Sequence, residues 1–136
     1  MDLKKLSDQF LVDDETGPEK LGEMIQKLLP YCVVRKNGTV DIIGGSFSGK
    51  ALVKLILSAR LVASKLAESS VSAEVTAEEI AAYTGLPKNQ AAARAKEVVD
   101  ERFAERSSRG SYKTKMHKIA NFLGELSVRA ASKEAE

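Results

Sequence analysis

The chain has 136 residues, 43% of them hydrophobic, and a formal net charge of +2. This length suffices for a hydrophobic core, which must consist mainly of aliphatic residues because aromatic residues are few and tryptophan is absent. The single cysteine, Cys32, excludes an intramolecular disulfide and favours a reducing compartment. One cysteine and one histidine, His117, cannot supply the usual ligands of a zinc site. We therefore expect neither a metal ion nor another cofactor.

The sequence also predicts a soluble, cytoplasmic protein without membrane partners. Its first ten residues lack the long apolar run of a secretory signal. The longest apolar stretch, residues 51–67, contains Lys54 and Arg60. Cations near the middle of a segment disfavour its insertion across a bilayer.

Residues 1–45 are predicted to form an N-terminal extension of two helices and a hairpin. Apolar residues recur at helical spacing over residues 2–11 and 18–29. Within residues 31–43, two apolar runs flank Asn37-Gly38, a pair typical of a two-residue type I′ turn in which both residues have positive φ. The apolar stripes of these helices predict either intramolecular core or a homodimer interface, and the same holds for the C-terminal helix.

Residues 44–50, GGSFSGK, match the spacing of a phosphate-binding loop, G-x-x-x-x-G-K. That motif continues with Ser or Thr, whereas this chain has Ala51, and the preceding strand belongs to a hairpin and not to a parallel sheet. We therefore interpret the segment as a joint in which Ser46 or Ser48 caps the next helix. Nucleotide binding is the third and least favoured hypothesis.

Residues 46–136 are predicted to form a second domain. A helix from about Phe47 to Leu66 is almost entirely apolar, so we expect it to be buried on most sides. Residues 71–75 can add a short strand, and residues 116–131 predict a C-terminal helix.

Between these elements, residues 76–101 have the pattern of a helix-turn-helix. Thr76 and Glu79 suit a capping box, Gly85 supplies the positive φ of a tight turn, and Pro87 opens the second helix. We expect its apolar positions to face inward; they are Ala91, Ala95 and Val98.

Residues 103–115 predict a basic hairpin, because apolar residues flank a Ser-Ser-Arg-Gly tip at 107–110. Between Pro87 and Lys118 there are nine basic residues and four acids, a net charge of +5 against +2 for the whole chain. Positive charge is therefore concentrated on the second helix and the hairpin.

The order of these elements resembles the winged helix-turn-helix family. Ala81, Gly85 and Leu86 stand where that family usually has small, glycine and apolar residues, and the resemblance strictly covers residues 76–115. It implies a mostly α fold with small β-hairpins: a winged helix-turn-helix core preceded by the helical and hairpin extension. Arg102 stands where the family often has glycine, which favours a second helix that continues to about Ala104 and a shorter wing.

The resemblance implies a protein that binds double-stranded DNA and regulates transcription. Family members place the N-terminal half of the second helix in the major groove and the hairpin, or wing, against the backbone or minor groove. Asn and Gln can pair with adenine and Arg and Lys with guanine, whereas wing cations contact phosphates. The candidate DNA-binding residues are Lys88, Asn89, Gln90, Arg94, Arg106, Arg109, Lys113 and Lys115.

The alternative is a winged-helix module for protein–protein contact, because a fold does not fix its function. The run of three alanines at residues 91–93 and the acidic N-terminal arm fit this alternative. A continuous positive face would favour DNA, whereas interruption by Glu97, Asp100 and Glu105 would favour a protein partner. We do not expect an enzyme, because no spacing gives His117 a nucleophile and an orienting carboxylate.

Overall fold

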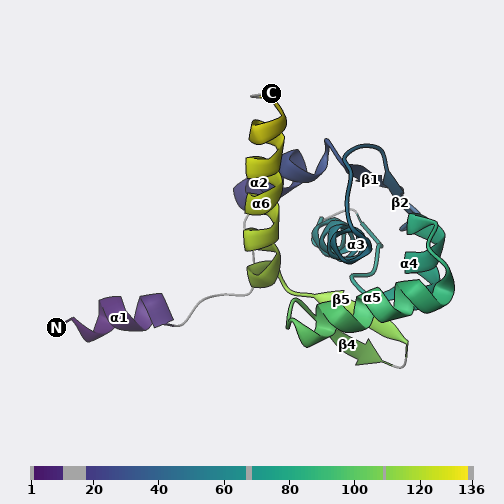
Figure 1. Cartoon of the computed structure of the whole chain (residues 1–136). Coiled ribbons are helices and arrows are strands. Elements are labelled where there is room, and N and C mark those ends of the chain that lie inside the picture. The colour runs from purple at the N-terminus through teal and green to yellow at the C-terminus, as the bar shows by residue number, and fades with distance from the viewer. Residues whose placement is uncertain (1, 11–17, 67–68, 109, 135–136) are drawn as a thin grey trace.

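The computed structural model describes residues 2–10, 18–66, 69–108 and 110–134, which form helices and two small antiparallel sheets (Figure 1). The predicted combination of helices and small β-hairpins is confirmed. The helices are α1 (Leu3–Phe10), α2 (Pro18–Leu28), α3 (Gly49–Ser64), α4 (Ala77–Thr84), α5 (Lys88–Asp100) and α6 (Met116–Glu134). The strands are β1 (Cys32–Val34), β2 (Val40–Ile42), β3 (Val75–Thr76), β4 (Ala104–Ser108) and β5 (Ser111–Thr114).

Helix α3 runs through the middle of the molecule and packs against α2, α6, α4, α5 and strands of both sheets (Figure 1). Its predicted burial is confirmed, since almost the whole segment 55–63 is shielded from solvent. The buried hydroxyl of Ser58 donates a hydrogen bond to the Lys54 carbonyl oxygen at 2.7 Å. A largely apolar helix at the centre gives the surrounding helices and strands a surface to cover.

The N-terminal extension and the rest of the chain share one hydrophobic core. Leu21 and Leu28 of α2 and Ile119 and Leu123 of α6 are all buried in it, and α2 packs on both α3 and α6. These residues of α2 and α6 are therefore intramolecular core, whereas Leu29, directly after α2, is 51% exposed. The domain boundary at residue 45 stays a prediction.

The β1–β2 hairpin forms as expected, but its predicted type I′ turn is wrong. The Gly38 N–H donates to the Arg35 carbonyl at 2.8 Å, and the Arg35 N–H donates to the Thr39 carbonyl at 2.8 Å. Gly38 has a φ of 94°, whereas Asn37 has no positive φ. The loop thus has three residues, 36–38, and only its last residue takes the left-handed conformation, a common alternative to the two-residue hairpin.

The second sheet has the order β3-β5-β4, so the last strand in sequence is the central one. Of the strand expected over residues 71–75, only Val75 is part of β3, which pairs with β5. Beyond that pair, the Ala77 N–H donates to the Gly110 carbonyl at 3.2 Å, which links the start of α4 to the hairpin tip. Ser108 pairs with Ser111, so the tip is shorter than the predicted 107–110.

The predicted continuation of α5 to about Ala104 is wrong, because α5 ends at Asp100 and β4 begins at Ala104. Arg102 adopts a φ of 65°, and its N–H donates to the Val99 carbonyl at 2.9 Å. The next N–H, that of Phe103, donates to the Val98 carbonyl at 3.2 Å. These two bonds form a Schellman motif in which arginine occupies the position usually held by glycine. The helix stops there despite the absence of glycine.

Candidate nucleic-acid interface

The helix–turn–helix segment begins with the predicted capping box. The Glu79 N–H donates to Thr76 Oγ1 and the Thr76 N–H donates to Glu79 Oε1, both at 3.1 Å. At the other end of α4, Gly85 has a φ of 76°, as expected. Pro87 stands one position earlier than predicted: it is the N-cap of α5, and the helix itself begins at Lys88. No side chain caps this terminus, so its first-turn N–H groups keep no capping partner.

Helix α5 presents one face to the core and the opposite face to solvent. Ala91, Ala95 and Val98 are at most 1% exposed, which confirms the predicted inner face. The exposed outer face consists of residues spaced by three and four positions, namely Asn89, Ala93, Lys96 and Asp100. Lys96 was not among the predicted DNA-binding residues, although its position opposite Val98 on the helical wheel could have indicated it.

The structure places the predicted residues of α5 in different surroundings. Lys88, Asn89 and Gln90 are exposed, as expected, and Lys88 Nζ lies 3.0 Å from Glu78 Oε1. Arg94 lies on the side of α5 that borders α3, and its side chain is 41% exposed. The aliphatic part of the Arg94 side chain packs on the start of α3, and its Cγ would lie 3.1 Å from a Cβ atom added to Gly49. The Arg94 Nη1 lies 3.2 Å from Glu97 Oε1. Arg94 is therefore a flank residue held by α3.

The predicted cations of the hairpin lie close to one acid. Lys113 Nζ and Lys115 Nζ are each 4.0 Å from a Glu105 carboxylate oxygen, because Glu105 pairs directly with Lys113 across the two strands. The Arg106 guanidinium carbon lies 5.9 Å from the ring centroid of Tyr112, its own cross-strand partner. Arg109 lies outside the described residues.

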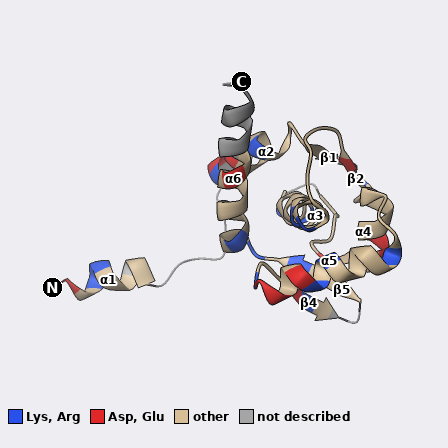
Figure 2. Ribbon diagram, viewed as in Figure 1, with Lys and Arg blue, Asp and Glu red and all other residues tan. Residues whose placement is uncertain are grey.

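Acidic and basic residues therefore alternate over this surface (Figure 2). Glu78, Glu97 and Glu105 each form an ion pair with a predicted DNA-binding cation, and Asp100 is exposed on the outer face of α5. By the charge criterion stated above, the positive face is interrupted. These pairs are solvent-exposed, however, and such pairs contribute little net free energy, so an incoming phosphate can replace the carboxylate at low cost.

A basic pocket of about 320 Å³ lies where the end of α5, the hairpin and the start of α6 meet. Five cations and one acid, Glu105, line it together with His117. Among the described residues, Arg102, Arg106 and Lys118 of this pocket form no ion pair, in contrast to Lys113 and Lys115, which both lie near Glu105. The pocket cations are Arg102, Arg106, Lys113, Lys115 and Lys118. With five cations and one acid, the lining of this pocket is strongly positive.

Buried Arg60 of α3 fixes the position of α4, a role that the sequence did not suggest. Its Nη1 lies 2.9 Å from Glu79 Oε2 and donates to the Gly38 carbonyl at 3.1 Å. Its Nε and Nη2 donate to the carbonyls of Ser72 and Glu74 at 2.8 and 3.0 Å. The one available signal was an arginine within a nearly apolar helix, because a buried charge requires partners.

The carboxylate of Glu79 joins this network to the capping box. Burial alone would raise its pKa, but hydrogen bonds from Arg60, the Thr76 N–H and the Tyr83 hydroxyl outweigh burial, and the net pKa is lowered. The pKa of Tyr83 is raised, first by burial and then by its hydrogen bond to Glu79 at 2.8 Å. Glu79 is therefore held in its ionised form.

A second ion-pair cluster joins the start of α3 to the end of α5. Lys50 Nζ lies 2.7 Å and Lys54 Nζ 3.2 Å from the Glu101 carboxylate. The hydrogen bond from Lys50 lowers the pKa of Glu101 and raises that of Lys50. In the glycine-rich segment, Ser48 Oγ accepts from the Ala51 N–H at 3.2 Å and caps α3. The interpretation of residues 44–50 as a helix-capping joint is confirmed.

Among the described residues, no group of three or more His, Cys, Asp or Glu side chains is placed to hold a metal ion. No helix in the described part of the chain is long and apolar enough to cross a membrane. Comparisons of the chain with protein-family models, curated proteins and solved structures found no match.

Proposed function

We propose that this protein is a winged helix-turn-helix protein that binds double-stranded DNA and acts in transcriptional regulation, without an enzymatic activity. The observation that carries the proposal is the arrangement of its elements. A short strand, β3, precedes the α4–turn–α5 unit and pairs with the second strand of the hairpin that follows it. This order of helix, strand, helix-turn-helix and hairpin is the one that the sequence resemblance implies.

In this proposal, α5 enters the major groove with its exposed outer face. Asn89 and Gln90 offer the side-chain amides that pair with adenine edges, and Lys96 offers a donor to guanine or phosphate. The uncapped N-terminus of α5 adds backbone N–H donors of the kind that bind phosphate oxygens. The side chain of Ala93 is small, so the helix can approach the bases closely.

The basic pocket and the hairpin supply the phosphate contacts. Lys113 Nζ and Lys115 Nζ each lie 4.0 Å from the carboxylate of Glu105, so neither is tightly held. Arg102 and Lys118 extend the positive surface toward α6. Contacts of this type determine affinity and its dependence on salt, whereas contacts to base edges determine sequence preference.

Fluorescence anisotropy tests the proposal with a random duplex and a duplex selected from a random pool, at about 50 and about 200 mM salt. Lys113→Ala should weaken binding equally on both duplexes and reduce the salt slope by about one unit. Gln90→Ala should lose about 1–3 kcal/mol more on the selected duplex than on the random one. Lys20→Ala, at an exposed position of α2, is the matched control and should change neither.

The second candidate function is a protein-interaction module, which the acids on this surface favour. The substitution Glu105→Gln separates the two. If DNA is the partner, removing this carboxylate frees Lys113 and Lys115, so duplex affinity should rise and the salt slope should steepen. Absence of duplex binding by the wild-type protein and by Glu105→Gln at low salt would reject the DNA proposal and leave the protein module.

A further inference from the structure

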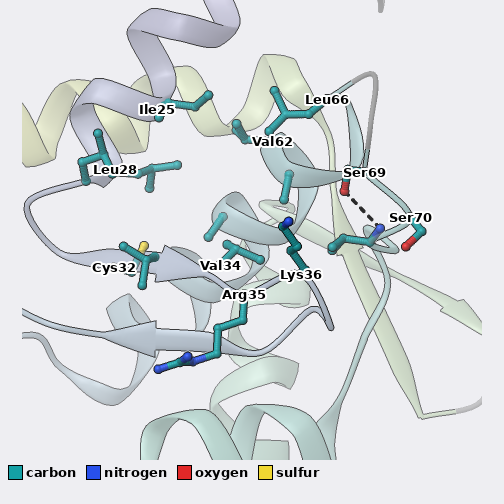
Figure 3. A pocket seen from close by; sticks show the side chains of 15 residues that line it. Ile25, Leu28, Cys32, Val34, Arg35, Lys36, Val62, Leu66, Ser69 and Ser70 are labelled. Atoms are coloured by element: carbon teal, nitrogen blue, oxygen red, sulfur yellow. Dashed lines mark hydrogen bonds between the residues drawn. The ribbon is translucent and has the colours of Figure 1, made fainter.

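An apolar groove of about 880 Å³ lies on the side of α3 that faces the N-terminal extension (Figure 3). Its walls come from the end of α2, strand β1, the end of α3 and residues 69–71. Ile25, Val34 and Val62 line its interior, and Lys36, Ser69 and Ser70 lie at its edge (Figure 3). Such a concave apolar surface is typical of a binding site.

Three large apolar side chains remain exposed in this groove. Leu29 is 51% exposed, Val33 37% and Leu66 41%. They come from three different segments that converge on one surface. Isolated exposed apolar residues are ordinary in soluble proteins, but a cluster on a concave surface indicates an interaction site.

Helix α1 itself has an exposed apolar face that complements the groove. Leu3, Leu6 and Phe10 follow helical spacing on one face and are 78%, 44% and 85% exposed. A helix of eight residues is marginal in water unless its apolar face packs on another surface. Figure 1 shows α1 standing apart from the rest of the molecule.

These two surfaces account for nearly all the large exposed apolar residues in the described part of the chain. Of seven such residues, three lie on α1 and three in the groove, and only Ile43 lies elsewhere. The match in chemistry is therefore specific to this pair of surfaces. These apolar residues come from neither α5 nor the β4–β5 hairpin, so the match is independent of the proposed DNA contacts.

We propose that α1 of one copy packs its apolar face into this groove of a second copy, and that reciprocal exchange makes the protein a homodimer. In Figure 1, α2 and α6 stand between α1 and the elements β1 and α3 that line its own groove. Exchange between two copies fills both grooves and covers both α1 helices through two equivalent contacts related by a twofold axis. Exchange of an identical element is an established route to dimers.

The first experiment measures mass by size-exclusion chromatography with light scattering over a range of concentrations of the full chain. The wild-type protein should show twice the 14.7 kDa mass of one chain. Phe10→Ser and Leu66→Glu should each shift it to the monomer, from opposite sides of the same contact. Ile43→Glu, at the exposed apolar residue outside both surfaces, is the matched control and should remain dimeric. A cooperative thermal transition in each variant verifies that it still folds.

The second experiment uses the absence of tryptophan from the chain. Phe10→Trp introduces a single fluorophore on α1, and its emission should be blue-shifted in the dimer and move to the red on dilution to the monomer. Three results would overturn the proposal: a wild-type monomer at every concentration, a dimer that survives both Phe10→Ser and Leu66→Glu, or a blue-shifted Trp in a monomer. The last result would mean that α1 fills the groove of its own chain.

Discussion

Replacing Arg60 should reveal how strongly one buried guanidinium stabilises the fold. Its side chain is 6% exposed and is held by Glu79, Tyr83 and three backbone carbonyls. Removing one partner of a buried ion pair costs about 3–5 kcal/mol. Arg60→Met preserves most of the length of the side chain, and Glu79, whose side chain is 35% exposed, can regain water. We therefore expect the lower end, about 3 kcal/mol.

Chemical and thermal unfolding monitored by circular dichroism measures this loss. At about 4 °C per kcal/mol for a chain of this size, the Tm should fall by about 12 °C. Glu79→Gln keeps an acceptor for the capping bond and should lose less, whereas Lys96→Met, at an exposed site, should change stability little. A loss in Arg60→Met no larger than that in Lys96→Met would refute the assignment of Arg60 as a structural hub.

The contribution of Glu79 to the stability of the fold should depend on pH. The pKa of Glu79 is lowered in the folded protein from its ordinary value of 4.5. Its ionised form therefore stabilises the fold fully above that value, and the stabilisation is lost as pH falls through the lower folded pKa. The difference in stability between the wild type and Glu79→Gln should shrink in that acidic range. A difference that stays constant from neutral pH to below pH 4 would contradict the role of the Glu79 charge.

Two further predictions concern single residues. Arg102→Gly should raise the free energy of unfolding by up to about 1 kcal/mol, because glycine adopts a positive φ without strain. It should also weaken duplex binding, because a cation of the basic pocket is lost. Arg102→Lys should leave both quantities nearly unchanged, and a less stable glycine variant would contradict the strain argument. Cys32 is only 2% exposed, and burial raises the pKa of its thiol to about 12. Because the side chain is shielded from solvent, a thiol reagent at pH 8 should label the protein only as fast as it unfolds. Immediate labelling of the folded protein would show that the thiol is accessible.

Local signals in the sequence predicted the elements that depend on local contacts. The Thr76–Glu79 capping box, the Gly85 turn and the inner face of α5 all involve residues within a few positions of one another, and each was confirmed. The 36–38 loop was mispredicted because Asn-Gly is compatible with more than one hairpin geometry.

Features that depend on distant partners could not be predicted in this way. Arg94 lies on the flank of α5 because Gly49, far away in the sequence, leaves space for its stem. The proximity of Glu105 to Lys113 follows from strand register, which the sequence did not specify. Arg102 adopts a conformation that its own propensity disfavours, because α5 must end where the sheet begins. Tertiary packing decides each of these positions.

The backbone links from Thr76 of β3 and Ala77 of α4 to the β4–β5 hairpin have a mechanical consequence for any partner of this surface. Thr76 pairs with Ser111, and the Ala77 N–H reaches the Gly110 carbonyl, so the tip cannot swing without pulling on the first turn of α4. The hairpin and α5 thus keep a fixed spacing before a partner arrives. A partner that needs this spacing loses little conformational entropy on association, whereas one that needs another spacing must first break main-chain hydrogen bonds. Selectivity for the shape of the partner is therefore built into the backbone, separately from any side chain that reads it.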